Sequence, residues 1–170
     1  MQELAGVLPI IQTPFDERGE IDFASLARAV DWAFAQGASG CGTGMVAETL
    51  RLSDDERRTL AERLVEMVAG RGPLFVSVGA ESTAQAVAFA RHAQAAGCDA
   101  VMAMPPTLSA LSSEALLEYF LALAEAVDLP LVVQDASSYV GQSIPLAVQV
   151  ELLARLGPDY RFDTEFWVDA

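Results

Sequence analysis

Seven polar residues of this sequence could bind or act on a small polar molecule, because each lies at or just after the end of a short apolar run. They are Thr13, Glu48, Thr49, Thr107, Gln134, Asp135 and Tyr139. Hydroxyl, amide and carboxylate groups at such positions fix polar substrates by hydrogen bonds. Glu48 can orient its loop or cap the next helix, and Gln134 with Asp135 can bind a substrate or satisfy groups of their own loop.

The cationic side chains are all arginines, ten in number, so the sequence contains no lysine. A guanidinium stays protonated and cannot serve as an amine nucleophile. The single histidine, His92, lies beside Arg91 in a predicted helix and is expected at the surface or the edge of the core. One histidine excludes a zinc centre that needs several, so we expect no metal-dependent aldolase.

The remaining candidates for metal or phosphate chemistry are weak. Cys41 and Cys98 do not have the spacing of a zinc site and are expected to be buried, inert thiols. The run Gly42–Gly44 lacks the spacing and the lysine of a phosphate-binding loop. A magnesium site would need carboxylates to gather, and solvated carboxylates are the simpler interpretation of Glu48, Asp135, Asp163 and Glu165. We therefore expect no metal and no cofactor.

Composition narrows the class of protein. The chain has 170 residues, 52% of them hydrophobic, which predicts one globular domain with a sizeable core. A net charge of −14 opposes binding to nucleic acid or anionic lipid. No apolar run reaches the roughly 20 residues of a membrane span, and the N-terminus does not resemble a signal peptide. A cytoplasmic protein without a nucleic-acid or membrane partner is expected.

Short apolar runs alternate with longer amphipathic segments at βα-unit spacing. Helix starts are predicted at Asp22, at the Ser53–Glu56 capping box, at Ser82 with Gln85, at Ser112 or Ser113, and at Ser143 with Pro145. Gly37, Gly97 and Gly157 predict helix ends. The strands are expected at 7–11, 40–44, 74–78, 100–104, 130–134 and, more weakly, 160–163.

Strict alternation predicts an α/β fold with a parallel sheet. A doubly wound sheet would need a glycine-rich loop after the first strand, but residues 12–15 are Gln-Thr-Pro-Phe, so a TIM (β/α)8-barrel is favoured. A complete barrel needs about 250 residues and eight strands. We expect an incomplete barrel of about five βα units plus a possible sixth strand over 1–162, followed by an atypical tail at 163–170. Open edge strands would favour a homo-oligomer.

The order of several motifs resembles the N-terminal part of the dihydrodipicolinate synthase and N-acetylneuraminate lyase family. The motifs are Thr13-Pro14-Phe15, the acidic turn 16–22, Gly44-Met45-Val46-Ala47-Glu48-Thr49 in place of Gly-Thr-Thr-Gly-Glu-Ser, Leu52-Ser53 with its acidic continuation, Val78-Gly79-Ala80, Ala96-Gly97-Cys98-Asp99-Ala100 and Met104-Pro105-Pro106. None is specific alone, but their shared order covers nearly the whole chain. The resemblance implies a barrel fold and a pyruvate-type aldolase or lyase.

In that family a lysine at the end of the sixth strand forms an imine with a 2-oxo acid. The protonated imine then acts as an electron sink. The resemblance places Arg161–Glu165 at the lysine position, and Gln134 at the position of a proton-relay tyrosine. Thr107 replaces a second tyrosine and Tyr139 an arginine. Met45 and Val46 replace the hydroxyl residues of the second-strand motif. The family's catalytic groups are therefore missing from this stretch.

Two functions follow as hypotheses. In the first, the chain is a truncated or inactive form of a Schiff-base aldolase or lyase that takes pyruvate or a related 2-oxo acid in the complete parent barrel. In the second, it is a non-catalytic fragment that oligomerises or binds a small acid. The first is favoured, because residues 163–170 depart abruptly from the βα pattern.

Overall fold

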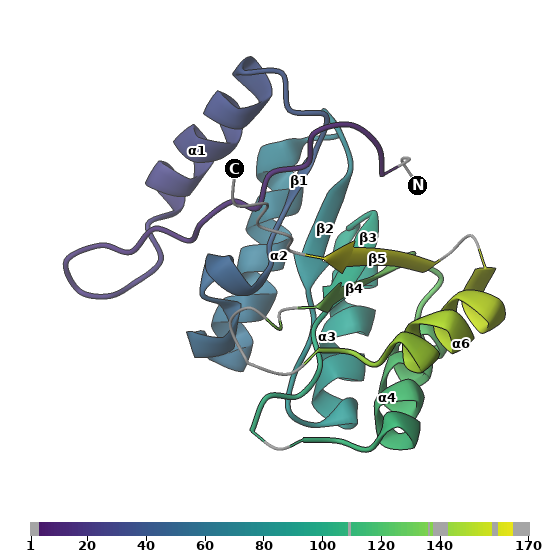
Figure 1. The fold of residues 1–170 in the computed structure, drawn as a ribbon. Helices are drawn as coiled ribbons and strands as arrows, with labels where there is room; N and C mark the ends of the chain where they lie inside the picture. The colour runs from purple at the N-terminus through teal and green to yellow at the C-terminus, as the bar shows by residue number, and fades with distance from the viewer. Residues whose placement is uncertain (1–3, 109, 136, 138–142, 158–159, 165–170) are drawn as a thin grey trace, which may run out of the picture. The chain divides into compact units, whose positions relative to one another are not determined.

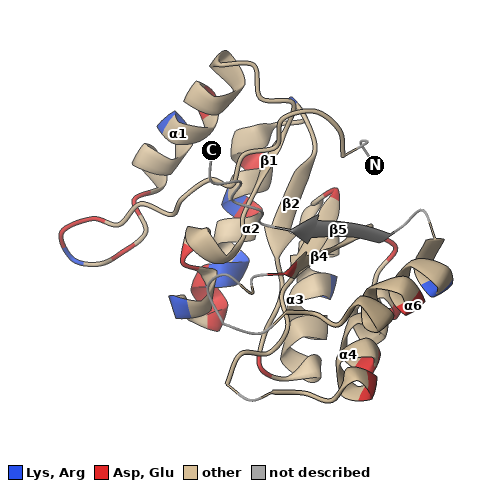
Figure 2. Cartoon of the chain, in the orientation of Figure 1, with Lys and Arg blue, Asp and Glu red and all other residues tan. Residues whose placement is uncertain are grey.

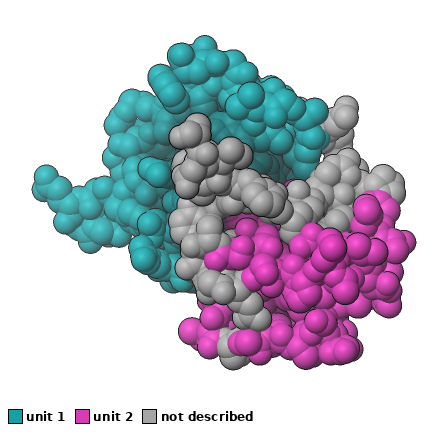
Figure 3. Space-filling view, in the orientation of Figure 1, with its two compact units in different colours: residues 1–77, 92–100 teal, residues 78–91, 101–170 magenta. Residues whose placement is uncertain are grey.

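The computed structural model describes residues 4–108, 110–135, 137, 143–157 and 160–164 (Figure 1). The chain divides into two compact units, unit 1 with residues 1–77 and 92–100 and unit 2 with residues 78–91 and 101–170 (Figure 3). The helices are α1 (Phe23–Ala35), α2 (Asp54–Val68), α3 (Thr83–Ala96), α4 (Ser113–Ala126) and α6 (Leu146–Leu156). The strands are β1 (Cys41–Gly42), β2 (Leu74–Ser77), β3 (Ala100–Ala103), β4 (Leu131–Asp135) and β5 (Tyr160–Thr164).

The helices of unit 1 begin where the sequence predicts. The carboxylate of Asp22 accepts a hydrogen bond from the Ser25 amide at the start of α1. Ser53 and Glu56 form a complete capping box at the start of α2, which satisfies two amide groups that the first helical turn leaves free. Both helix starts are confirmed, and α1 packs against α2.

The first predicted strand of unit 1, at 7–11, is wrong as a continuous strand. Only Ile10 forms a bridge, parallel to Gly42 of β1. Two causes combine: Pro9 has no amide hydrogen, and β1 itself is only two residues long. β1 pairs in parallel with β2, and a Cβ atom at Gly42 would lie 2.4 Å from the Phe75 ring. The absence of a side chain at Gly42 therefore lets Phe75 cover the strand.

In unit 2, β3 pairs in parallel with β4, and β4 with β5. The amide of Val78 donates to the carbonyl oxygen of Met102 at 2.8 Å, which continues the parallel pairing beside β3. All residues of β3 and β4 are buried, as expected for a parallel sheet covered by helices. The predicted strands in these regions are confirmed, with ends that shift by a residue.

The helix starts in unit 2 confirm two predictions and correct a third. Ser82 caps α3 by accepting from the Gln85 amide at 3.2 Å. Ser112 caps α4 by accepting from the Ala115 amide at 3.2 Å. Ser143 does not cap the last helix, because Pro145 occupies the cap position without a side-chain hydrogen bond. The Pro145 carbonyl oxygen instead accepts from the Val148 amide at 2.9 Å. Gly157 follows α6 with φ +58, as its predicted role as a helix end requires.

Apolar side chains fill the interior of each unit. Leu26, Val30 and Leu64 are buried in unit 1, and Phe120 and Leu123 in unit 2. The charged residues that Figure 2 colours lie chiefly on helices and loops. Within the described ranges, no helix combines the length and apolar character that crossing a bilayer requires.

Candidate functional site

Thr13 and Thr49 belong to one group of hydrogen bonds in unit 1, built around the loop that follows β1. The hydroxyl of Thr13 donates to the carbonyl oxygen of Ala47 at 2.7 Å. The hydroxyl of Thr49 donates to the carbonyl oxygen of Gly44 at 3.3 Å. Both threonines are buried, with 6% and 2% of their surface exposed. Each hydroxyl hydrogen is therefore committed to holding the 44–49 backbone.

Glu48 lies in the same loop but faces outward. It joins two short 3-10 helices, Met45–Ala47 and Thr49–Arg51, and has the left-handed backbone angle φ 61. It occupies the cap position of the second helix without a side-chain cap bond, and its carboxylate pairs with Arg51. A left-handed backbone is uncommon outside glycine and asparagine, so this turn shapes the loop.

Thr43 is a buried polar residue of unit 1 that the sequence does not single out as a site. Its hydroxyl oxygen accepts a hydrogen bond from the Ser77 amide at 2.8 Å, and only 3% of the residue is exposed. The bond fastens the end of β1 to the end of β2. The only sequence signal for Thr43 was its place in the Gly42–Gly44 run, and the role of Thr43 in this structure is structural.

Thr107 of unit 2 is held by Glu81, a second residue absent from the predicted site. One carboxylate oxygen of Glu81 accepts from the Thr107 amide at 2.9 Å and from its hydroxyl at 2.8 Å. The other oxygen accepts from the Leu108 amide at 3.1 Å. Partial burial alone would raise the pKa of Glu81, but these three hydrogen bonds outweigh it and lower the pKa. Glu81 thus ties the loop that precedes α3 to the loop that follows β3.

We expect the Glu81 bonds to weaken at low pH. Because the folded state lowers the pKa of Glu81, their contribution is present above the carboxyl group's ordinary pKa. It is lost as the pH falls through the lower folded value. The protection factors of the Thr107 and Leu108 amides against hydrogen exchange should then fall. Glu81→Gln should accelerate the same amides at neutral pH, and unchanged exchange in the variant would contradict the assignment.

Gln134 and Asp135 end β4 and are both buried, with 2% and 9% of their surface exposed. One oxygen of Asp135 accepts from the Ser137 amide at 2.9 Å, and the other accepts from the Ile144 amide at 3.1 Å. Asp135 therefore anchors the backbone on both sides of the segment that follows β4. The strand register places Asp163 beside Gln134. Tyr139 lies outside the described residues.

Tyr119 is a buried phenol of unit 2 that sequence reasoning missed. Its hydroxyl accepts from the Ala80 amide at 3.1 Å and donates to the Ala80 carbonyl oxygen at 3.2 Å. The residue lies within α4, away from any predicted strand end, so no sequence signal marked it. Its hydroxyl supports the backbone just after β2.

The two cysteines are free and buried. Burial raises the pKa of Cys41 to about 11 and that of Cys98 to about 12, so both thiols are protonated near neutral pH. The prediction of buried, inert thiols is confirmed. His92 lies at the edge of unit 1, with Nε2 3.2 Å from a Glu62 oxygen. Within the described part of the chain, no group of histidine, cysteine and carboxylate side chains could hold a metal ion.

The curated proteins whose sequences match this chain are synthases. The 4-hydroxy-tetrahydrodipicolinate synthase of Gluconacetobacter diazotrophicus is 34% identical over 157 residues, which cover 92% of this chain and 52% of that protein. The corresponding enzyme of Azoarcus sp. is 40% identical over 133 residues, covering 78% and 46%. The chain thus spans about half the length of the curated relatives it matches.

Solved structures also match the fold of this chain. A crystal structure of dihydrodipicolinate synthase matches with a TM-score of 0.84 at 30% identity, over 91% of this chain and 53% of that one. YagE of Escherichia coli K12, solved in complex with pyruvate, matches with a TM-score of 0.88 at 25% identity, over 98% and 56%. The expected fold class, part of a (β/α)8-barrel, is confirmed. Because residues 3–157 match the model of the Dihydrodipicolinate synthetase family, the chain belongs to that family.

Proposed function

We propose that this chain is the substrate-loop part of a Schiff-base aldolase or lyase and that its 170 residues alone do not catalyse the reaction. The observation that carries the proposal is the absence of lysine from a chain of this family. Imine formation with a 2-oxo acid needs an unprotonated primary amine, which an arginine side chain cannot supply.

The described residues fit a supporting role. The hydroxyls of Thr13 and Thr49 hold the loop after β1, and Asp135 holds the segment after β4. In barrels of this type, such loops at the carboxyl ends of strands shape the substrate site. We propose that Gln134 and Thr107, both in unit 2, contact pyruvate or a related 2-oxo acid in a complete barrel.

We also propose what the reaction needs besides this chain, the compartment of the protein and its small-molecule partner. The complete reaction would need the rest of the barrel, since the matched stretch covers only 52% of a curated synthase. Its two unpaired, buried cysteines suit a reducing cytoplasm. The parent's partner would be a small 2-oxo acid, a choice supported by the pyruvate complex of YagE.

Borohydride trapping with pyruvate tests the catalytic proposal. We expect no side-chain adduct on this chain, whereas the Gluconacetobacter diazotrophicus synthase, as positive control, should gain one reduced pyruvate per subunit. Peptide mapping by mass spectrometry separates a side-chain adduct from one at the N-terminal amine. A stoichiometric adduct on any internal residue would refute the proposal.

A second candidate function, a non-catalytic oligomerising fragment, is favoured by one observation. Leu146, Val150 and Leu153 lie on one face of α6 and are 72%, 58% and 57% exposed. Their i, i+4, i+7 spacing makes a continuous apolar stripe that association would bury. Light scattering distinguishes an oligomer from a monomer, and Val150→Glu should dissociate an assembly that uses this stripe.

A further inference from the structure

The hydroxyl group of Thr107 in unit 2 has a fixed hydrogen-bond polarity. A threonine hydroxyl offers one hydrogen and two lone pairs. The hydrogen of Thr107 goes to Glu81, because an ionised carboxylate can only accept, and the two oxygens lie 2.8 Å apart. Thr107 is an exposed residue. Its hydroxyl oxygen can therefore accept a further hydrogen bond from outside, but it has no hydrogen left to donate.

The carboxylate of Glu81 is held in this orientation by the backbone that follows β3. Its oxygens also accept from the Thr107 and Leu108 amides, at 2.9 and 3.1 Å. Although partial burial raises the pKa of Glu81, its hydrogen bonds to Thr107 and Leu108 lower the pKa overall. The carboxylate therefore stays ionised at neutral pH and keeps the hydroxyl hydrogen of Thr107.

The backbone in front of Glu81 is fixed by two further contacts of unit 2. The Tyr119 hydroxyl bonds to both the amide and the carbonyl oxygen of the buried Ala80, at 3.1 and 3.2 Å. A Cβ atom at Gly79 would lie 3.0 Å from the Met104 carbonyl oxygen, so the lack of a side chain permits this close approach. The side chain of Glu81 thus extends from a backbone that has little freedom to move.

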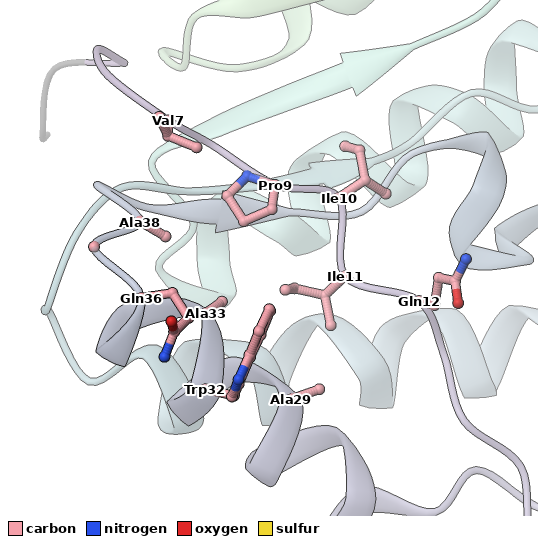
Figure 4. A pocket seen from close by; sticks show the side chains of 11 residues that line it. Val7, Pro9, Ile10, Ile11, Gln12, Ala29, Trp32, Ala33, Gln36 and Ala38 are labelled. Atoms are coloured by element: carbon pink, nitrogen blue, oxygen red, sulfur yellow. The ribbon is translucent and has the colours of Figure 1, made fainter.

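A hollow of about 470 Å³ in unit 1 has no comparable polar device. Figure 4 shows its lining, where Gln12 and Gln36 supply the amide side chains among apolar neighbours such as Ile11. None of the lining residues is charged. A side-chain amide both donates and accepts, so it does not distinguish a donor on a ligand from an acceptor. Thr107 beside Glu81 does make this distinction, because both residues present only acceptors.

We propose that Glu81 is a positioning residue that makes Thr107 select a hydroxyl group on the ligand. The proposal rests on the proposed contact between Thr107 and a 2-oxo acid, and it names the part of the acid that Thr107 recognises. A carboxylate or keto oxygen offers only lone pairs, which would meet the lone pairs of Thr107 and the negative charge of Glu81. An alcohol group would instead donate its hydrogen to Thr107 Oγ1. The preferred acid therefore carries a hydroxyl substituent, which pyruvate lacks.

The test compares two probes that differ by one hydroxyl group, pyruvate and 3-hydroxypyruvate, on the full 170-residue chain. The two acids have the same charge, so the ratio of their affinities isolates the hydroxyl group. A titration followed by the NMR amide resonance of Thr107 gives both dissociation constants. We expect 3-hydroxypyruvate to bind about 5- to 10-fold more tightly, the gain typical of one added hydrogen bond.

Glu81→Ala should bring this ratio close to 1, because the Thr107 hydroxyl can then donate as well as accept. Thr107→Val should do the same, since it keeps the shape of the side chain and removes the hydroxyl, whereas Thr107→Ser should retain the preference. Glu125→Ala is the matched control, because it removes the same charge from an exposed glutamate near the C-terminal end of α4. It should leave the ratio unchanged. A purely structural role of Glu81 would weaken both probes equally and also leave the ratio unchanged.

Two results would overturn the proposal while leaving the contact at Thr107 in place. They are equal affinities of the two acids for the unchanged chain, and a preference that survives Glu81→Ala. If neither acid shifts the Thr107 resonance, both the selection and the contact are refuted. Borohydride trapping is independent of all three results, because it reports amine chemistry and not the contact at Thr107.

Discussion

Phe120→Ala is expected to lower the free energy of unfolding by about 3–5 kcal/mol, the usual cost of removing a buried aromatic ring. Phe120 lies on α4, has 0% of its surface exposed and contacts the Tyr119 ring edge-on at 5.2 Å between centroids. α4 packs against both α6 and β4. The lost ring would leave a cavity at the centre of unit 2, which the surrounding backbone cannot close completely.

Urea unfolding followed by circular dichroism measures this loss as a lower midpoint. Leu108→Ala is the control, because it removes an apolar side chain that is 85% exposed in the loop after β3. Its effect should stay within about 0.5 kcal/mol. Equal midpoints for the two variants would show that Phe120 does not belong to a rigid core.

Asp135→Ala is expected to lower the free energy of unfolding by about 2–4 kcal/mol, because it leaves two amides without their acceptor. Those amides belong to Ser137 and Ile144. A pure substrate-binding residue would behave differently, since its removal would leave stability unchanged in the absence of ligand. The urea midpoint of the ligand-free variant therefore separates a structural role from a binding role.

Asp135→Asn is the matched control for this experiment. Its amide keeps one acceptor oxygen in place of two, so about half of the loss is expected. Hydrogen exchange should show the Ser137 or the Ile144 amide protected, but not both. A wild-type midpoint for Asp135→Ala would mean that the carboxylate does not anchor this segment.

Several features of the protein could be predicted from the sequence because they depend on local order along the chain. The capping box at Ser53 and the caps at Asp22 and Ser112 need only residues three positions apart. Apolar runs indicate buried strands, as at 74–78 and 100–104. The absence of lysine is a fact of composition, and the order of motifs identifies the family.

Other features were decided by contacts between residues distant in sequence. Glu81 binds Thr107, Tyr119 binds Ala80, and Thr43 binds Ser77, over separations of 26, 39 and 34 residues. The sequence marks polar residues but not their partners, so Thr13 was predicted as a site candidate while its hydroxyl is committed to Ala47.

Periodicity and capping act within a few residues, so the sequence by itself determined the helices and most strands. Composition alone determined the lack of a side-chain amine nucleophile. Burial and hydrogen-bond partnership depend on how separate segments meet in space. The tertiary structure alone therefore decided which polar groups hold the loops. It also decided how much of the 7–12 segment pairs with β1. A buried donor or acceptor must find a partner within about 3 Å, and only the folded chain supplies it.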